Sequence, residues 1–399
     1  MSNILWYNGY ELLIKAVVKA DNCDLYDDKG RRYVDLESGV WRTSVGHNHS
    51  GIHKALNEQA NEISHSGFTY SHPVVEESAS LILNLLGFEA GKCVFLCSGS
   101  EAVEYGVRAM QQLSAKPLLL TMADSYFGAY GSASLKKEDE WFSFNWIDCT
   151  TCHKQEFCDP ECERFKKIPF GEIGGFLFEP GSSSGFVRFP PKSLIEIFSR
   201  TIRMHGGLLM INEVTTGTGR TGEWFGYQHY EIKPDIVAIG KGIGNGYPVS
   251  VAAFSNKVGQ ELEKHPIRYA QSHQNDPLGA KVVMEVISII SRENLISRSL
   301  ALGDYLIKAL KEITRKHAII REVRGRGLML AIELQDNESF ENTIFVQNEL
   351  FRKGYIIARR PGTNVLRMDP ALTIPESYLK NFITDFEFIV GDLNKRSSR

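Results

Sequence analysis

A lysine set among glycines is the residue of this chain whose position most favours covalent chemistry. Lys241 follows the apolar run 234–240 and is followed by Gly242, Gly244 and Gly246. An apolar run that ends in a polar residue is typical of a buried parallel strand that delivers a side chain to a site. Burial strips water from the ammonium, which lowers its pKa and gives an amine able to form a Schiff base. On spacing alone, a lysine that reaches solvent from a glycine turn explains the pattern equally well.

A second apolar run, residues 206–211, turns polar at Asn212 and Glu213 and leads into a glycine-rich segment. That segment, residues 217–222, reads Gly-Thr-Gly-Arg-Thr-Gly and formally fits the dinucleotide-binding pattern. The next residues, 223–226, begin no amphipathic helix whose N-terminus could face a pyrophosphate. We therefore set a nucleotide-binding function aside.

A short Ser-Gly-Ser turn offers a place for a phosphate. Ser98, Gly99 and Ser100 follow the strand-like run 92–97 and open a helical pattern. The first turn of a helix presents unpaired N–H groups and the positive end of the helix dipole, and the two serines add hydroxyls. Alone, this tripeptide is a common turn, so its meaning depends on the segments around it.

Taken together, these segments resemble the signature of the class III aminotransferases, fold-type I enzymes that use pyridoxal 5′-phosphate (PLP). The resemblance covers about residues 20 to 390, and the signature is matched at Glu213, Val214, Thr216, Gly217, Gly219, Arg220, Thr221, Gly222, Pro234, Asp235, Ile236, Lys241 and Gly242. Asn212 stands where the family has Asp, and Thr215 where it usually has Gln. The resemblance implies a PLP-dependent aminotransferase that moves an amino group between an amino acid or amine and a keto acid or aldehyde.

The resemblance also implies which residues hold the cofactor. Lys241 would carry PLP as a Schiff base and, once displaced by the substrate amine, would move the proton between substrate and cofactor. The other contacts would come from Ser98, Gly99 and Ser100 at the phosphate, Tyr126 and Val214 on the two faces of the ring, Asn212 at the ring nitrogen, and Ser272 across a subunit interface. Such sharing implies a homodimer with active sites built from both subunits.

Three residues are candidates for substrate contacts by the same resemblance. Trp41 and Phe68 would line the wall of the site, and Arg367 matches an Arg that often meets a substrate carboxylate. The family often has a Glu that holds this Arg aside, whereas Ser184 stands at that position here. We therefore expect Arg367 to have no carboxylate partner of its own and to be free for a carboxylated substrate.

The Asn at position 212 bears on the chemistry. In the family, an Asp at this position keeps the ring nitrogen protonated, so that the ring can accept electrons. Asn carries no charge, and its amide is expected to donate to an unprotonated nitrogen, which predicts a weaker electron sink and slow transfer. Glu213 is the next residue on a strand and should point to the opposite face, so we expect it not to replace the missing charge. An amino acid racemase, an epimerase, an aminomutase and a weakly catalytic PLP-binding protein are the alternative functions.

Four of the seven cysteines are clustered with the spacing C-x₂-C-x₅-C-x₃-C, at Cys149, Cys152, Cys158 and Cys162. Thiols this dense in a chain without a secretory signal favour metal ligation over disulfides. A tetrahedral Cys₄ zinc site needs two short chelating pairs, which this spacing supplies. We predict a structural zinc site. An iron–sulfur cluster, a regulatory disulfide and four unligated thiols in a surface loop are the alternatives.

Composition excludes several classes of partner. The chain has 399 residues, 45 basic and 48 acidic side chains and a formal net charge of −3, which argues against a nucleic-acid partner. No apolar run reaches the roughly 18 residues of a membrane span. The first residues lack a basic region followed by an apolar one, so no secretory signal is apparent and we expect a cytoplasmic enzyme.

The order of apolar runs predicts an α/β fold. Strand-like runs at 93–97, 117–122, 175–178, 208–214, 236–240 and 249–254 alternate with helical patterns such as 103–114 and 194–205. Such alternation predicts a mostly parallel sheet of the seven-stranded type with helices on both faces. We expect the PLP-dependent transferase fold type I. Residues 46–285 would form the large PLP-binding domain with the cysteine-rich insertion 149–162, and residues 286–399 a small α/β domain joined by the N-terminal segment 1–45.

Overall fold

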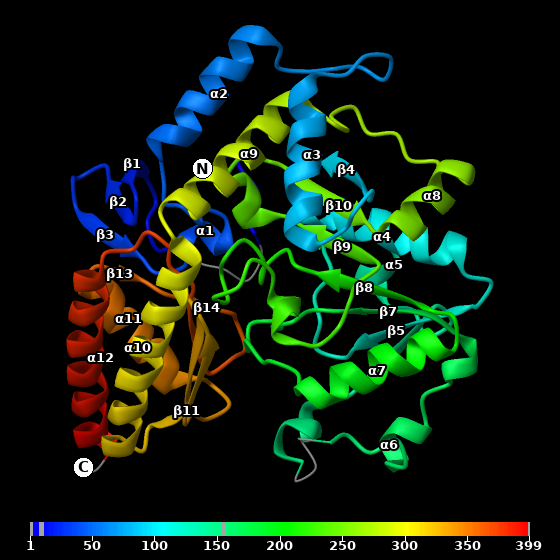
Figure 1. The fold of residues 1–399 in the computed structure, drawn as a ribbon. Coiled ribbons are helices and arrows are strands. Elements are labelled where there is room, and N and C mark those ends of the chain that lie inside the picture. Colours follow the sequence, from blue (N-terminus) through cyan, green and yellow to red (C-terminus); the bar gives the residue numbers. More distant parts are fainter. Residues whose placement is uncertain (1–2, 8–11, 153–156, 398–399) are drawn as a thin grey trace.

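The computed structural model describes residues 3–7, 12–152 and 157–397 as an α/β fold with one large sheet and two smaller ones (Figure 1). The large sheet has seven strands in the order β4-β10-β9-β8-β7-β5-β6. Their bounds are β4 (Lys92–Leu96), β5 (Leu118–Met122), β6 (Trp141–Phe144), β7 (Ile173–Phe178), β8 (Leu208–Asn212), β9 (Ile236–Ile239) and β10 (Ser250–Phe254). Only β10 runs against its neighbours, which confirms the predicted mostly parallel sheet.

Helices cover both faces of this sheet because its central strands are apolar on both sides. Leu177, Met210 and Ala238 belong to the core beneath α4 (Gly99–Leu113). Their neighbours along the same strands belong to the core that includes α7 (Lys192–Met204). Successive residues of a strand point to opposite faces, so the continuous apolar runs in the sequence correspond to strands buried on both sides.

Local signals in the sequence set the limits of the helices. Pro73 occupies the first turn of α3, and Gly87 ends it with a left-handed φ of 67°. Ser98 caps α4, with its hydroxyl accepting from the N–H of Glu101. The other helices associated with the large sheet are α2 (Ser50–Glu62), α3 (Pro73–Leu86), α5 (Ser132–Leu135), α6 (Glu163–Lys166), α8 (Asn256–Lys264) and α9 (Pro277–Arg292).

The two termini build the smaller part of the molecule together. Strand β13 (Tyr355–Ile356) pairs in parallel with β3 (Arg32–Asp35), which extends the N-terminal sheet of β1 (Val17–Asp21) and β2 (Asp24–Asp27). A separate antiparallel sheet contains β11 (Ile320–Arg326), β12 (Met329–Leu334), β15 (Val365–Met368) and β14 (Ala358–Arg359). Helices α10 (Leu295–Lys316), α11 (Glu341–Arg352) and α12 (Glu376–Ser397) complete this predicted smaller α/β unit (Figure 1).

Helix α9 links the two parts. Val282, Val286 and Ile289 lie in the core of the smaller unit, whereas Ala280 and Val283 lie in the core of the large sheet. The domain boundary expected at residue 285 therefore falls inside a helix that both cores share. None of the helices in the described part of the chain is long and apolar enough to cross a membrane.

Arg220 joins three segments that are distant in the sequence. Its buried guanidinium donates to the carbonyl oxygens of Leu328 and Pro370 and to the hydroxyl of Ser38. The Ser38 hydroxyl in turn donates to the carbonyl of Asp369 over 2.6 Å. A guanidinium can satisfy several acceptors at once, and here it ties the large unit to the N-terminal segment and to the end of β15.

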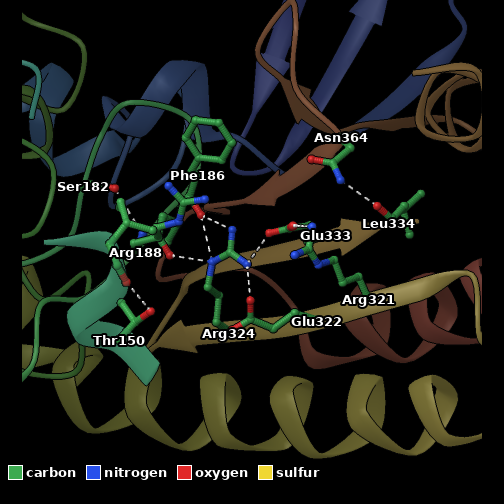
Figure 2. Close-up of polar contacts among 12 residues, drawn as sticks. Thr150, Ser182, Phe186, Arg188, Arg321, Glu322, Arg324, Glu333, Leu334 and Asn364 are labelled. Carbon is green, nitrogen blue, oxygen red and sulfur yellow. Dashed lines mark hydrogen bonds and ion pairs between the residues drawn. The ribbon is translucent and has the colours of Figure 1, made fainter. Parts of the chain in front are cut away.

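A second arginine fixes the loop that follows β7. Figure 2 shows Arg324 of β11 between Phe186 and the carboxylates of Glu322 and Glu333. It donates to the carbonyl of Phe186 at 2.6 and 2.9 Å and lies 2.8 Å from each carboxylate. The loop is closed on itself by the N–H of Ser182, which donates to the Arg188 carbonyl over 2.8 Å.

Candidate active site

Five parallel strands of the large sheet end at one edge, and each delivers a residue with polar groups. β4 leads to Ser98, β5 to Tyr126, β7 to Glu179, β8 ends at Asn212, and β9 leads to Lys241. In open α/β sheets, ligands bind outside the carboxyl ends of the strands. The edge is therefore the candidate site, and the described structure brings together there most of the residues predicted from the sequence.

Lys241 begins a short turn, Lys241–Gly244, with a backbone φ of 48°. A left-handed conformation at a residue other than glycine costs free energy and is common at functional sites. Burial lowers the pKa of Lys241 to about 8, against the attraction of Glu179 and with help from Arg367. Near neutral pH, a much larger fraction of this side chain is therefore the neutral amine that Schiff-base formation requires than in an ordinary lysine.

Trp41 contacts two cations at this site. The Nζ of Lys241 lies 4.7 Å from the indole centroid, and the guanidinium carbon of Arg367 lies 3.6 Å from it. Residues Ser38–Trp41 all have positive φ, and the Trp41 N–H bonds the Glu37 carbonyl over 3.0 Å. Such a left-handed turn costs about 1–2 kcal/mol per residue that is not glycine, so the surrounding contacts must hold it in place.

The expectation that Arg367 has no carboxylate partner is wrong. Its Nε donates to Oδ2 of Asp369 over 3.0 Å, and both side chains are buried. β15 presents Arg367, and Asp369 follows that strand by one residue, so the acid comes from the same segment and not from the loop around Ser184. The bond uses Nε only, and the fork formed by the two terminal nitrogens is left for other acceptors.

The Ser-Gly-Ser turn lies at the N-terminus of α4, as predicted. The Ser98 hydroxyl donates to Oε2 of Glu101 over 3.0 Å, and Oγ of Ser100 accepts from the N–H of Ala129 over 3.0 Å. A Cβ added at Gly99 would lie 2.7 Å from Cγ1 of Val214. The turn and Val214, two residues after β8, therefore pack closely enough that only glycine fits at position 99.

Asn212 is buried and fully engaged through its nitrogen. Nδ2 donates to Oε1 of Glu179 over 3.2 Å and to the Tyr126 carbonyl over 3.3 Å, and Oδ1 accepts from the N–H of Val214 over 3.1 Å. Glu213 faces away, as expected: its carboxylate accepts from Thr216 and from two backbone N–H groups beyond residue 225. Burial raises the pKa of both Glu179 and Glu213 to about 7.

The residues present fit a phosphate-bearing aromatic cofactor with an aldehyde. The site has a helix N-terminus for the phosphate and a desolvated amine at Lys241. Between them, Gly99 and Gly240 pack closely against Val214. Three buried polar atoms in the segments that build it, Nε1 of Trp41, Oγ1 of Thr215 and Oδ1 of Asp369, have no hydrogen-bond partner among the described residues. Buried polar groups are normally paired, so these atoms are suited to a ligand.

Three predicted residues lie outside this buried cluster in the single chain. Phe68, between α2 and α3, is 75% exposed, and Ser272 is exposed on the segment that leads to α9. The Tyr126 side chain is 48% exposed, although its backbone is fixed by Glu179 and Asn212.

The cysteine-rich insertion follows β6 and is bounded by two short helical turns. Cys149 belongs to the turn Ile147–Thr151, Cys162 precedes α6, and an ion pair between Asp148 and Arg164 joins the two turns. Residues 153–156 of the insertion lie outside the described residues. All seven cysteines are unpaired thiols. In the described part of the chain, the group of metal-ligand atoms that converges is His65, His273 and Asp276, not the four thiols.

Sequence reasoning missed Glu179 and Asp369 as members of the site. Glu179 is the first residue after an apolar run of six buried residues, so the strand-end signal that identified Lys241 was present there too. Asp369 lies two residues after Arg367. In an extended segment this spacing places both side chains on the same side, but β15 was not recognised as a strand from the sequence.

The chain is similar to curated aminotransferases along most of its length. The family model described as aminotransferase class-III matches residues 7–390. The ornithine aminotransferase 1 of Staphylococcus aureus is 28% identical over 95% of each chain, and the acetylornithine aminotransferase of Methanopyrus kandleri is 26% identical over 83% of this chain and 84% of its own. A protein of Thermococcus litoralis named leucine/methionine racemase is 29% identical over 95% of this chain and 91% of its own.

Solved structures share the fold. A Bacillus anthracis aminotransferase superimposes with a TM-score of 0.88 at 24% identity, covering 98% of this chain and 96% of its own. The acetylornithine aminotransferase of Elizabethkingia anophelis gives 0.82 at 24% identity, covering 97% and 96%. Since the family model spans nearly the whole sequence and the fold agrees with it, this chain belongs to the class III aminotransferases, a family of PLP-dependent enzymes.

Proposed function

We propose that this enzyme transfers an amino group between an amino acid or amine and a keto acid or aldehyde, with Lys241 as its catalytic residue. The observation that carries the proposal is the desolvated amine of Lys241, held at a strand end beside Trp41 in a chain of this family. When bound, PLP supplies a carbonyl for the amine and a ring that accepts electrons. The Nζ of Lys241 would then take the proton from the substrate carbon and deliver it to the cofactor carbon that had been the aldehyde, so that the amino group stays with the cofactor.

The cofactor contacts are proposed as follows. The N-terminus of α4 with Ser98, Gly99 and Ser100 binds the phosphate through N–H groups and the dipole of a 15-residue helix. Val214 packs on one face of the ring, which its close packing against Gly99 and Gly240 supports. The half-exposed Tyr126 covers the other face.

The substrate is proposed to carry a carboxylate. Arg367 keeps two terminal nitrogens beyond its bond to Asp369, and its guanidinium is buried against Trp41. A guanidinium fork binds a carboxylate through two parallel hydrogen bonds. The relatives named ornithine and acetylornithine aminotransferases support an amino acid as donor.

Racemisation is the second candidate reaction. It is favoured by the similarity over 95% of this chain to the Thermococcus litoralis protein named leucine/methionine racemase. Both reactions begin with proton removal by the lysine, so the residues described above serve either one. They differ in whether the amino group leaves the substrate's carbon skeleton.

The first prediction concerns the identity of the lysine. Borohydride fixes PLP to the amine that holds it, so reduction of the yellow enzyme and peptide mapping should place one pyridoxyl group on Lys241. The Lys241→Ala variant should fold and carry no label. The control variant Lys136→Ala should keep the label on Lys241. A label on a different lysine would contradict the proposed function.

The pKa of Lys241 predicts how cofactor uptake depends on pH. Burial lowers that pKa to about 8, so the neutral amine grows as pH rises through this value and is then fully formed. We expect the rate of PLP uptake by cofactor-free enzyme to rise to about pH 8 and to level off, as followed by absorbance. A rate that keeps rising tenfold per pH unit toward the ordinary lysine value, about 10.4, would contradict this account.

Arg367→Ala should discriminate between two kinds of donor. Losing hydrogen bonds to a charged group costs about 1.5–3 kcal/mol, so KM should rise about 10- to 100-fold for amino acids and little for plain amines. Comparing both donors in the same variant cancels any general damage from the unpaired Asp369. Equal effects on both donors would remove Arg367 from the substrate site.

A homodimer with shared sites is proposed from the family resemblance, since Phe68 and Ser272 lie exposed in the single chain. Sedimentation should give a dimer. The Ser272→Ala variant should bind PLP more weakly and should still be a dimer. A monomer that holds PLP as tightly as the dimer would argue against shared sites.

The cysteine-rich insertion is proposed to bind structural zinc. Its support is the spacing of the four thiols and the ion pair that joins their turns; binding would draw the thiols together. Metal analysis should find about one zinc per chain. Chelation should destabilise the insertion and leave PLP absorbance unchanged. Protein that contains no zinc and has four titratable thiols in the insertion would refute the proposal. As a control, Cys93→Ala changes a cysteine outside the insertion and should leave the zinc content unchanged.

A further inference from the structure

A buried carboxylate contacts Asn212 from the neighbouring strand. Glu179 is 3% exposed, and four donors surround its two oxygens. Oε1 accepts from the hydroxyl of Ser183 over 2.5 Å and from Nδ2 of Asn212 over 3.2 Å. Oε2 accepts from the N–H groups of Tyr126 and Ser183 over 3.1 and 3.2 Å. The acceptor capacity of an ionised carboxylate is thereby used in full.

These partners suit the ionised form of Glu179. A protonated carboxyl group needs an acceptor, yet two of the four partners are backbone N–H groups and one is an amide nitrogen, all of which only donate. The charged and titratable groups that face Glu179 are Asp124, Tyr126, Lys136 and Lys241. Burial raises the pKa of Glu179 to about 7, whereas the donors and the two lysines favour its negative charge.

The contacts of Asn212 decide what this side chain can offer to a ligand. Both hydrogens of Nδ2 are used, one by Glu179 and one by the Tyr126 carbonyl. Oδ1 accepts from the Val214 N–H and retains a second lone pair. Asn212 can therefore accept one more hydrogen bond but cannot donate one. This contradicts the expectation that its amide donates to an unprotonated ring nitrogen.

We propose that Glu179 and Asn212 act as one unit that keeps the cofactor's ring nitrogen protonated, with Glu179 supplying the negative charge and Asn212 the accepting oxygen. The inference rests on the proposed function, because it requires PLP to be bound at Lys241. Glu179 is then a positioning residue that polarises Asn212 and fixes the direction of its amide. The ring remains an effective electron acceptor although position 212 carries no charge.

The unit predicts an unusual response to Asn212→Asp. An aspartate here would bring an oxygen to about the place of Nδ2, 3.2 Å from Oε1 of Glu179. Two carboxylates this close cannot both ionise and would share a proton. Restoring the family's acid in this chain should therefore weaken the site. The double variant Glu179→Gln/Asn212→Asp exchanges amide and carboxylate and should restore it.

The test is the nitrogen-15 chemical shift of PLP labelled at its ring nitrogen, measured against pH in the wild-type holoenzyme and in variants. The wild type should give a protonated nitrogen at neutral pH. Glu179→Gln should lower the pH midpoint of ring protonation by about 1–3 pH units, the usual effect of one neighbouring charge. The double variant should return the midpoint toward that of the wild type. An unprotonated ring in the wild type, or a midpoint unchanged by Glu179→Gln, would overturn the inference.

Glu213→Gln is the matched control, because Glu213 is equally buried, has its pKa raised to about 7 and faces away from Asn212. It should lower thermal stability and leave the midpoint unchanged; a midpoint that moves as far as in Glu179→Gln would overturn the inference. If Glu179→Gln fails to fold, the Asn212→Asp single variant and the double variant still decide, because the inference requires the second substitution to reverse the effect of the first. Borohydride labelling separates the two failures: no label on Lys241 in the wild type overturns the proposed function and this inference together, whereas an intact label with an unresponsive ring overturns this inference alone.

Discussion

The amine of Lys241 lies 4.7 Å from the indole centroid of Trp41 in a largely desolvated position, and the remainder of the site is arranged around that contact. The two residues come from different parts of the fold: the lysine from the end of β9 and the tryptophan from a left-handed turn in the N-terminal segment. Burial lowers the pKa of this amine to about 8, and the contact with Trp41 requires the two parts to keep their relative position. Arg220 and Arg324 hold the two parts together, since each joins the large unit to the smaller one through backbone carbonyls. Figure 2 shows the contact of Arg324 with Phe186.

Charges of both signs surround the amine. Arg367 lies against the ring of Trp41 and pairs with Asp369, and Glu179 follows β7 and contacts Asn212. Burial of an unpaired charge is costly, so each of these groups is paired or bonded to several donors. The same pairing that stabilises the carboxylates also fixes the directions in which Arg367 and Asn212 can still bind a ligand.

Much of this arrangement could be predicted from the sequence because the large sheet is buried on both faces. The continuous apolar runs that end at Asn212 and Lys241 are strands with those residues at their carboxyl ends. The short strand β6 at the sheet's edge, by contrast, is buried only at its two ends, and the exposed Ser143 interrupts its apolar run. Strand β15 was missed because Arg367 interrupts its apolar pattern, although that side chain is buried.

The contacts between side chains of different strands could not be predicted in the same way. The motif around Asn212 indicated a missing charge, but only the pairing of β7 with β8 reveals that Glu179 lies beside it. Within a single segment, Arg367 was expected to be unpaired because Ser184 replaces the family's acid, but Asp369 lies two residues further along the chain and pairs with it. The four clustered thiols lie on or beside short turns, and their spacing in the sequence does not determine how closely these turns approach one another.

Transfer of the amino group itself tests the central claim most directly. An amino acid donor labelled with nitrogen-15 would be incubated with the holoenzyme and an unlabelled keto acid, and both amino acids analysed by mass spectrometry and chiral chromatography. The proposed function predicts that the label appears in the amino acid formed from the keto acid, and that Lys241→Ala abolishes this transfer. A donor that loses its chirality while keeping the label on its own carbon skeleton would contradict an aminotransferase and establish racemisation.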